Sequence, residues 1–169
     1  MTSPLYEASV PVFRQMLDAL ADLLRKGEAH AREHGLDPDA MLAARLAPDM
    51  LTLAGQVQRA SDHAKGAAGR LAGLEPPPFT DNERSLAEAH ARISRTLDYI
   101  GTVPVEAFVH AAERTITLPF GVPPMPAARY LYGFALPSLF FHVATAYAIL
   151  RHRGVPLGKR DFLGSYVPQ

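Results

Sequence analysis

The segment from Tyr130 to Leu150, YLYGFALPSLFFHVATAYAIL, contains no Asp, Glu, Lys or Arg, and its most polar side chain is His142. An uncharged run of this length is either a helix that crosses a bilayer, which takes about 20 apolar residues, or the central helix of a bundle, with neighbours covering every face. Gly133, Pro137 and Thr145 weaken the membrane interpretation. The other helical segments also have apolar stripes that need a partner, so we expect a bundle helix.

Composition excludes several classes of protein. The chain has 169 residues, the size of a single domain, and 17 basic residues balance 17 acidic ones. No basic surface is therefore expected to attract nucleic acid. Cysteine is absent, which excludes disulfides, thiolate nucleophiles and zinc–thiolate sites. The first residues lack the pattern of a signal peptide. We expect one domain over residues 1–169, located in the cytoplasm, with neither a membrane nor a nucleic acid as partner.

Apolar residues recur at steps of three and four in four segments, which predicts four long helices. The segments are about 4–34, from Pro48 to about 71, from a Thr80–Glu83 capping box to Gly101, and about 130–153. A short helix is expected over 39–46. The third and fourth long helices are joined by residues 102–128, an irregular stretch in which only 115–118 has strand character. Such a long connection is a natural rim for a pocket.

Two further features concern packing. Glu75 is followed by three prolines, which predict a stiff, extended connector between the second and third long helices. The second long helix carries alanines together with Gly66, Gly69 and Gly73, which give it a thin face that another backbone can approach closely. This face is either a dimer seam or a site of tight packing within the bundle, and the second arrangement is the commoner one.

Several blocks of residues are similar to those of a known family. They are YEASVPVF (6–13), ARLAPDM (44–50), QVQ (56–58), AKGAA (64–68), ITLP (116–119), FALP (134–137), FHVATAYAILRH (141–152) and GKRDFLG (158–164). Together they resemble the DUF1993 family, bacterial proteins without an assigned function that are similar to the DinB-like group. The resemblance implies an all-α, up-down four-helix bundle with a long irregular crossover before the last helix, often dimeric. We therefore expect a homodimer.

The resemblance also raises the question of a metal. Many DinB-like proteins hold a divalent metal with three histidines, one on the second helix and a pair spaced by four on the fourth. Here His142 matches one of that pair, but the position four residues later is Ala146. The second-helix position falls near Gln56, with Asp62 and His63 one to two turns further along. Because a catalytic metal needs about three protein ligands and an open position, we expect neither a metal nor another cofactor.

The same residues form the candidate pocket for a small-molecule ligand. Its members are Gln56, Asp62, His63, His142 and Tyr147. We expect His142 to be a core histidine bonded to a backbone carbonyl or to a tyrosine hydroxyl, because a buried unpaired ring costs about 1–3 kcal/mol. The candidate tyrosines are Tyr6, Tyr132 and Tyr147.

No zinc-protease motif, phosphate-binding loop, dinucleotide fingerprint or nucleophile elbow is present in the sequence. Catalytic residues therefore cannot be assigned, and whether the protein is an enzyme stays open. The first hypothesis is a homodimeric small-ligand-binding or interaction protein without a metal. The alternative is a divergent DinB-like enzyme of the thiol-dependent transferase type, with a polar pocket around His142. A regulator acting through a partner protein is a weaker third, because no helix has the basic flanks of a DNA reader.

Overall fold

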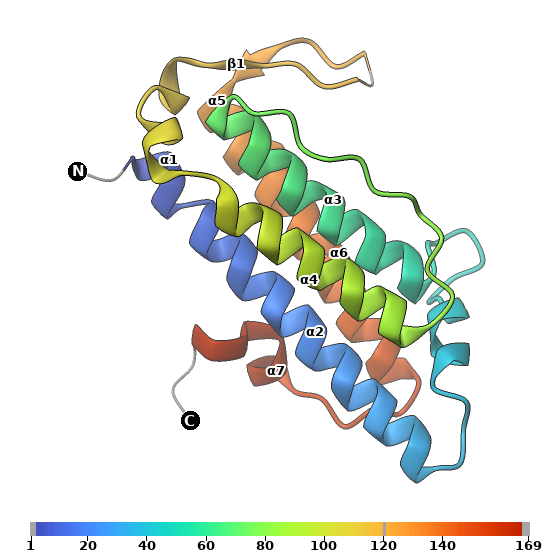
Figure 1. Ribbon diagram of the computed structural model, residues 1–169. Helices are drawn as coiled ribbons and strands as arrows, with labels where there is room; N and C mark the ends of the chain where they lie inside the picture. Colours follow the sequence, from blue (N-terminus) through green and yellow to red (C-terminus); the bar gives the residue numbers. More distant parts are fainter. Residues whose placement is uncertain (1–2, 120, 167–169) are drawn as a thin grey trace.

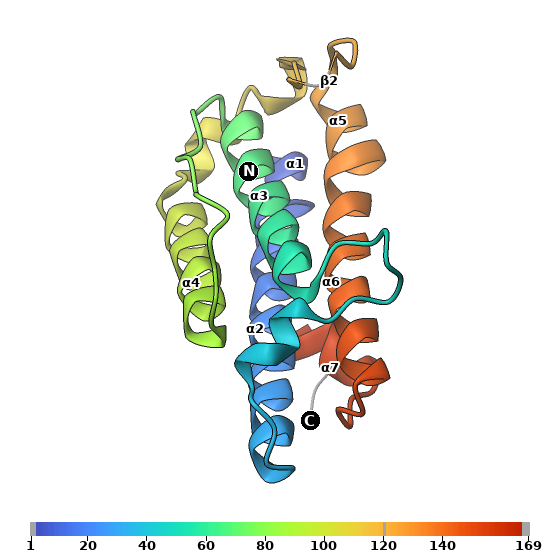
Figure 2. The same cartoon turned by 90° about the vertical axis from the view of Figure 1, so that its right-hand side faces the viewer.

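The structure is a computed structural model that describes residues 3–119 and 121–166. Four long helices form a bundle (Figures 1 and 2): α2 (Val10–Glu33), α3 (Leu53–Ala72), α4 (Leu86–Thr102) and α6 (Leu136–His152). The shorter helical elements are α1 (Pro4–Glu7), η1 (Asp39–Ala43), η2 (Val105–Phe108), η3 (Ala111–Glu113), α5 (Ala127–Tyr130), η4 (Leu131–Ala135), α7 (Lys159–Leu163) and η5 (Gly164–Tyr166). The all-α bundle expected from the sequence is confirmed.

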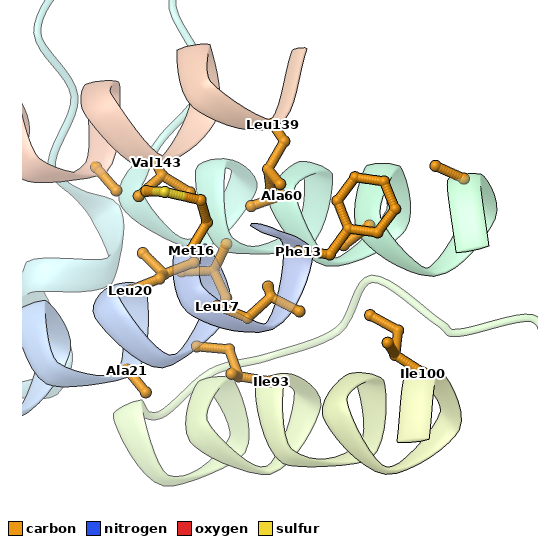
Figure 3. Close-up of a cluster of buried hydrophobic side chains, with 14 of the residues drawn as sticks. Phe13, Met16, Leu17, Leu20, Ala21, Ala60, Ile93, Ile100, Leu139 and Val143 are labelled. Atoms are coloured by element: carbon orange, nitrogen blue, oxygen red, sulfur yellow. The ribbon is translucent and has the colours of Figure 1, made fainter. Parts of the chain in front are cut away.

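Helix α3 packs against both α4 and α6, and its contact with α6 is the most extensive between any two helices described. Apolar side chains from all four long helices meet beside it (Figure 3), including Phe13 and Leu17 from α2 and Val143 from α6, none of which is exposed. The thin face predicted for this helix is used within the bundle, since Gly66 and Gly69 are buried there together with the alanines around them.

The connector after α3 spans the length of that helix rather than making a short turn. We call residues 74–85 the strap; Figure 1 shows it in green, running back along α3. The backbone N–H of Leu74 donates to the Gly69 carbonyl at 2.8 Å, and near the other end Gln58 donates to Glu83 at 2.8 Å. The strap therefore returns the chain to the start of α3, so that α4 runs in the same direction as α3.

Helix α4 begins five residues later than the predicted capping box. Ser85 and Glu88 form the observed box, and the expected box of Thr80 and Glu83 is wrong. The reason is tertiary: Arg92 donates to the carbonyl oxygen of Thr80 at 3.0 Å and to the carboxylate of Glu83 at 2.9 Å. Both sequences fit the local pattern of a capping box. Because the Glu83 carboxylate is bound by Arg92, it does not cap a helix at Thr80, and the helix begins after Ser85 instead.

The irregular crossover before α6 agrees with expectation. Its strand content is one short pair, β1 (Thr115–Ile116) against β2 (Met125–Pro126), antiparallel. Pro137 then lies in the first turn of α6, directly after the π-helical segment η4. A wider turn there is consistent with the backbone donor that proline lacks.

The chain after α6 returns to the bundle surface. Helix α7 packs against α2, where Gln15 donates to the carbonyl oxygen of Leu163 at 2.8 Å and Phe162 packs on the core. Phe162 and Leu163 therefore hold this end of the chain on the bundle, while the side chain of Tyr166 lies outside the described ones.

One expectation about α6 is wrong. Its inner face is buried, but its outer face is not covered: Phe141 is 56% exposed, Tyr132 in η4 is 54% exposed and Phe140 is 38% exposed. The segment from Ala127 to His152 is long and apolar enough to cross a membrane, yet its inner face belongs to the protein core. Because α6 packs mainly on α2 and α3 at the edge of the bundle, its third side remains open.

We predict opposite outcomes for two glycine substitutions in α3. A Cβ at Gly69 would lie 2.7 Å from the hydroxyl of Tyr99 and 2.9 Å from the carbonyl oxygen of Leu74, so Gly69→Ala should cost about 1–3 kcal/mol of stability. A Cβ at Gly66 would meet the mobile end of Arg70, so Gly66→Ala should gain about 0.5–1 kcal/mol from helix propensity. Urea unfolding of both variants checks this, and equal effects would contradict the assignment of Gly69 to the strap contact.

Candidate functional site

A hydrogen bond between α3 and α6 defines the polar centre of their contact. The side-chain nitrogen of buried Gln56 donates to the Leu51 carbonyl at 3.2 Å, which directs its oxygen toward His142. That oxygen lies 2.8 Å from Nδ1 of His142 and accepts its proton. The tautomer of His142 is thereby set, with the proton on Nδ1 and a lone pair on Nε2. The partner is thus a glutamine and not the backbone carbonyl or tyrosine hydroxyl expected from the sequence.

Aromatic rings surround this hydrogen bond. The ring of His63 stacks on that of His142, with centroids 5.3 Å apart and planes 16° apart. Phe134 meets His63 edge to face at 5.5 Å, and Phe141 meets His142 in the same way at 5.2 Å. The two histidines thus lie between apolar rings, and both are half-buried.

The same line of contact continues toward the other end of α3. Arg70 follows His63 by seven residues and so lies on the same helix face, with Nη1 3.4 Å from the hydroxyl of Tyr130. Tyr130 in turn stacks on Phe134 at 5.9 Å. We call this row of side chains the α3–α6 seam; it consists of Gln56, His63, Arg70, Tyr130, Phe134 and His142.

Burial keeps both seam histidines uncharged at neutral pH. It lowers the pKa of His142 from 6.5 to about 4, and the nearby His63 and Arg59 lower it further. The pKa of His63 is lowered by burial and by Arg59, and Asp62 opposes this shift only in part. Two neutral imidazoles can each offer one donor and one acceptor, so these two rings are suited to hydrogen bonding rather than to carrying charge.

The carboxylate of Asp62 belongs to a separate network on the strap side of α3. Arg92 is fully buried, and its guanidinium lies 2.9 Å from the carboxylates of Asp62, Asp81 and Glu83. Lys65 adds a further contact to Asp62 at 3.3 Å. The pair of Arg92 with Glu83 is buried on both sides, and removing one partner of such a pair costs about 3–5 kcal/mol, so this contact fixes the strap to the bundle.

Sequence reasoning missed the role of Arg92, although its position contained a signal. The residue lies on the buried stripe of α4, between Ala89 and Thr96 and next to Ile93, which are all buried. An arginine on an apolar helix face requires carboxylate partners, and the strap supplies two of them.

Tyr147 was expected in the pocket, but it lies on another face of α6 than His142. It follows His142 by five residues, which is about 140° around the helix, and it packs on the core.

The donor set does not fit the metal site that the fold group implies. The two histidine rings are stacked face to face, and Nδ1 of His142 is already bonded to Gln56, so their lone pairs do not converge on one point. Ala146, four residues after His142, has no donor. Among residues 3–119 and 121–166, no group of three His, Asp or Glu could hold an ion. The absence of a cofactor stays a prediction, which metal analysis of untagged protein checks.

Comparison with known proteins places the chain in a family. Residues 5–163 match the family model described as "Domain of unknown function (DUF1993)". The chain belongs to the DUF1993 family. A crystal structure of a DinB family member protein from Shewanella denitrificans is similar to this DUF1993 chain, with 38% identity and a TM-score of 0.92 over 98% of this chain and 94% of that one. No curated protein matches.

We predict that His142 makes the stability of this DUF1993 protein depend on pH below neutrality. Its folded-state pKa, about 4, lies below its ordinary value of 6.5, so the unfolded state binds more protons between these values. The contribution is complete above pH 6.5 and is lost as the pH falls from 6.5 toward 4. NMR titration of the ring and urea unfolding across this range check it; His142→Gln should remove that part of the slope, and a wild-type ring titrating near 6.5 would refute the assignment.

Proposed function

We propose that this DUF1993 protein is a cytoplasmic homodimeric bundle that binds a small molecule in the α3–α6 seam without a metal. The observation that carries the proposal is that buried Gln56 meets two half-buried histidines, His63 and His142, which lie between Phe134 and Phe141. Few polar groups with fixed directions among apolar rings are typical of small-molecule sites.

The chemistry of the seam indicates what such a ligand offers. Because Gln56 holds the proton of His142 on Nδ1, Nε2 is an acceptor that needs an N–H or O–H donor. Phe134 and Phe141 present apolar edges to the two imidazoles, which suits a flat apolar body. A planar molecule with one hydrogen-bond donor meets both requirements.

The alternative is a divergent enzyme of the thiol-dependent transferase type, in which Nε2 of His142 removes a proton. The fixed tautomer favours this role, because it leaves that nitrogen unprotonated. The pKa of about 4 argues against it, since an efficient general base has a pKa near the working pH. The seam is therefore better suited to binding than to proton transfer.

Benzyl alcohol, with one ring and one O–H donor, tests the binding proposal. We expect saturable shifts of the His63 and His142 ring signals in NMR titration, with affinity in the millimolar range. His142→Phe keeps a ring but removes the acceptor, and should weaken binding about fivefold, the value of one hydrogen bond. His152→Phe, at the exposed end of the same helix, is the matched control. Unchanged ring signals in the wild-type protein would contradict the proposal.

The dimer part of the proposal concerns the outer face of α6. Tyr132, Phe140 and Phe141 are exposed on a stretch without any charged side chain. Exposed aromatic surface depleted of charge is typical of the core of an interface. Such a face has no charge pattern to select a different protein, whereas a twofold axis pairs the patch with its own copy. A second copy is therefore the occupant we propose.

The two parts of the proposal are connected through Phe141. This residue is exposed on the outer face, and its ring also lies edge to face with that of His142, with the ring centroids 5.2 Å apart. A second copy on this face therefore covers one side of the seam and shields the ligand from water.

Phe141→Glu should make the protein monomeric, because it puts a charge at the centre of the proposed interface. Val109→Glu is the control, since Val109 is 64% exposed but directly follows η2, away from α6. Size-exclusion chromatography with light scattering at micromolar concentration is the measurement. A monomeric wild-type protein would remove the dimer from the proposal and leave the seam untouched.

A further inference from the structure

Arg70 has no acidic partner, unlike the three cations on the strap side of α3. Arg59, Lys65 and Arg92 are all paired with carboxylates of Asp62 or the strap. Within the described part of the chain, no carboxylate lies within ion-pair distance of Arg70. Its guanidinium contacts only the neutral hydroxyl of Tyr130, at the long distance of 3.4 Å, although the side chain is half-buried.

The guanidinium of Arg70 lies near His63, although its Cα is two turns away along α3. Side chains on a helix lean toward its N-terminus, and a Cβ built on Gly66 would lie 2.4 Å from Nη1 of Arg70. The charged group therefore occupies the space above Gly66, one turn from His63. A glycine inside a helix costs about 0.5–1 kcal/mol relative to alanine, and here its bare backbone leaves room for the guanidinium.

We propose that the α3–α6 seam binds a small organic carboxylate with one N–H or O–H donor on its flat apolar body. The carboxylate pairs with Arg70, the flat body lies against Phe134 and His63, and the donor bonds to Nε2 of His142. The inference rests on the proposed function and specifies the chemical class of its ligand. It depends on the position of Arg70 in the seam and on the lack of a carboxylate beside it. It also depends on the aromatic wall, by which we mean the rings of Tyr130, Phe134 and His63; the first of these contacts Arg70 through its hydroxyl.

The charges around the seam favour an anion there. Asp62 is the nearest carboxylate on α3, and it is already bound by Arg92 and Lys65. Both histidines are neutral, so Arg70 leaves one positive charge uncompensated. A planar guanidinium matches the two oxygens of a carboxylate. The aromatic wall then favours an organic acid over a free inorganic anion, which has no apolar surface to bury.

NMR titration with three probes tests the inference: benzoate, benzyl alcohol and inorganic phosphate. Benzoate has the carboxylate but no donor, so it tests the pair with Arg70 by itself. It should shift the ring signals of His63 and Phe134 and bind about tenfold more tightly than either of the others, because a charged hydrogen bond is worth more than the neutral one that benzyl alcohol makes. Arg70→Gln should abolish this preference. Gly66→Ala should also abolish it by displacing the guanidinium, while thermal unfolding shows that the bundle is intact. Arg14→Gln, an exposed arginine on α2, should leave it unchanged.

The outcomes separate this inference from the function on which it rests. If benzyl alcohol binds as tightly as benzoate, or if Arg70→Gln keeps the preference, the seam binds ligands without selecting anions and only the inference fails. If phosphate binds as tightly as benzoate, the site is for free anions and the organic part fails. If none of the three probes shifts the seam signals, both the inference and the binding function are wrong.

Discussion

The contact between α3 and α6 is the feature on which both the site and the exposed face depend. Small residues line the buried part of α3, and among them Ala60, Ala64 and Ala67 are not exposed at all. Small side chains allow neighbouring helices to approach closely. This closeness brings His63 within stacking distance of His142 and allows Gln56 to reach across. Larger side chains on this face would separate the rings and leave Gln56 without its partner.

The network around Arg92 determines the electrostatics of the seam from the opposite side of α3. An arginine buried on α4 must be neutralised, and the strap supplies Asp81 and Glu83 for this purpose while α3 supplies Asp62. The strap therefore does more than connect two parallel helices. By holding Asp62, the network leaves the seam with two neutral imidazoles and the positive charge of Arg70, a combination that no single segment of the sequence displays.

The sequence predicted what local patterns determine. The periodicity of apolar residues located the four long helices, and the family resemblance singled out Gln56, His63 and His142 as candidate pocket residues. It could not choose between two capping boxes, because the patterns at Thr80 and Ser85 are equivalent until Arg92 binds Glu83.

Two features could not be predicted from the sequence: the exposed face of α6 and the hydrogen-bond partner of His142. Both depend on how distant segments of the chain pack together. An uncharged helix looks alike whether its own chain or another molecule covers it, so the pattern did not reveal that Phe141 is exposed. The hydrogen bond from His142 joins residues 86 positions apart, and its formation depends on the Leu51 carbonyl that orients the glutamine. Such choices are made by packing between distant segments and not by spacing along one helix.

Phe141 also provides a physical route by which the proposed dimer and the proposed ligand would influence each other. In that dimer, a second copy on the outer face of α6 would remove water from beside His142, which would strengthen the hydrogen bonds and charge interactions in the seam. By thermodynamic reciprocity, a ligand that binds more tightly in the dimer must also stabilise the dimer by the same free energy. The neutral state of His142 is consistent with this arrangement, because covering a charged imidazole would cost free energy that covering a neutral acceptor does not.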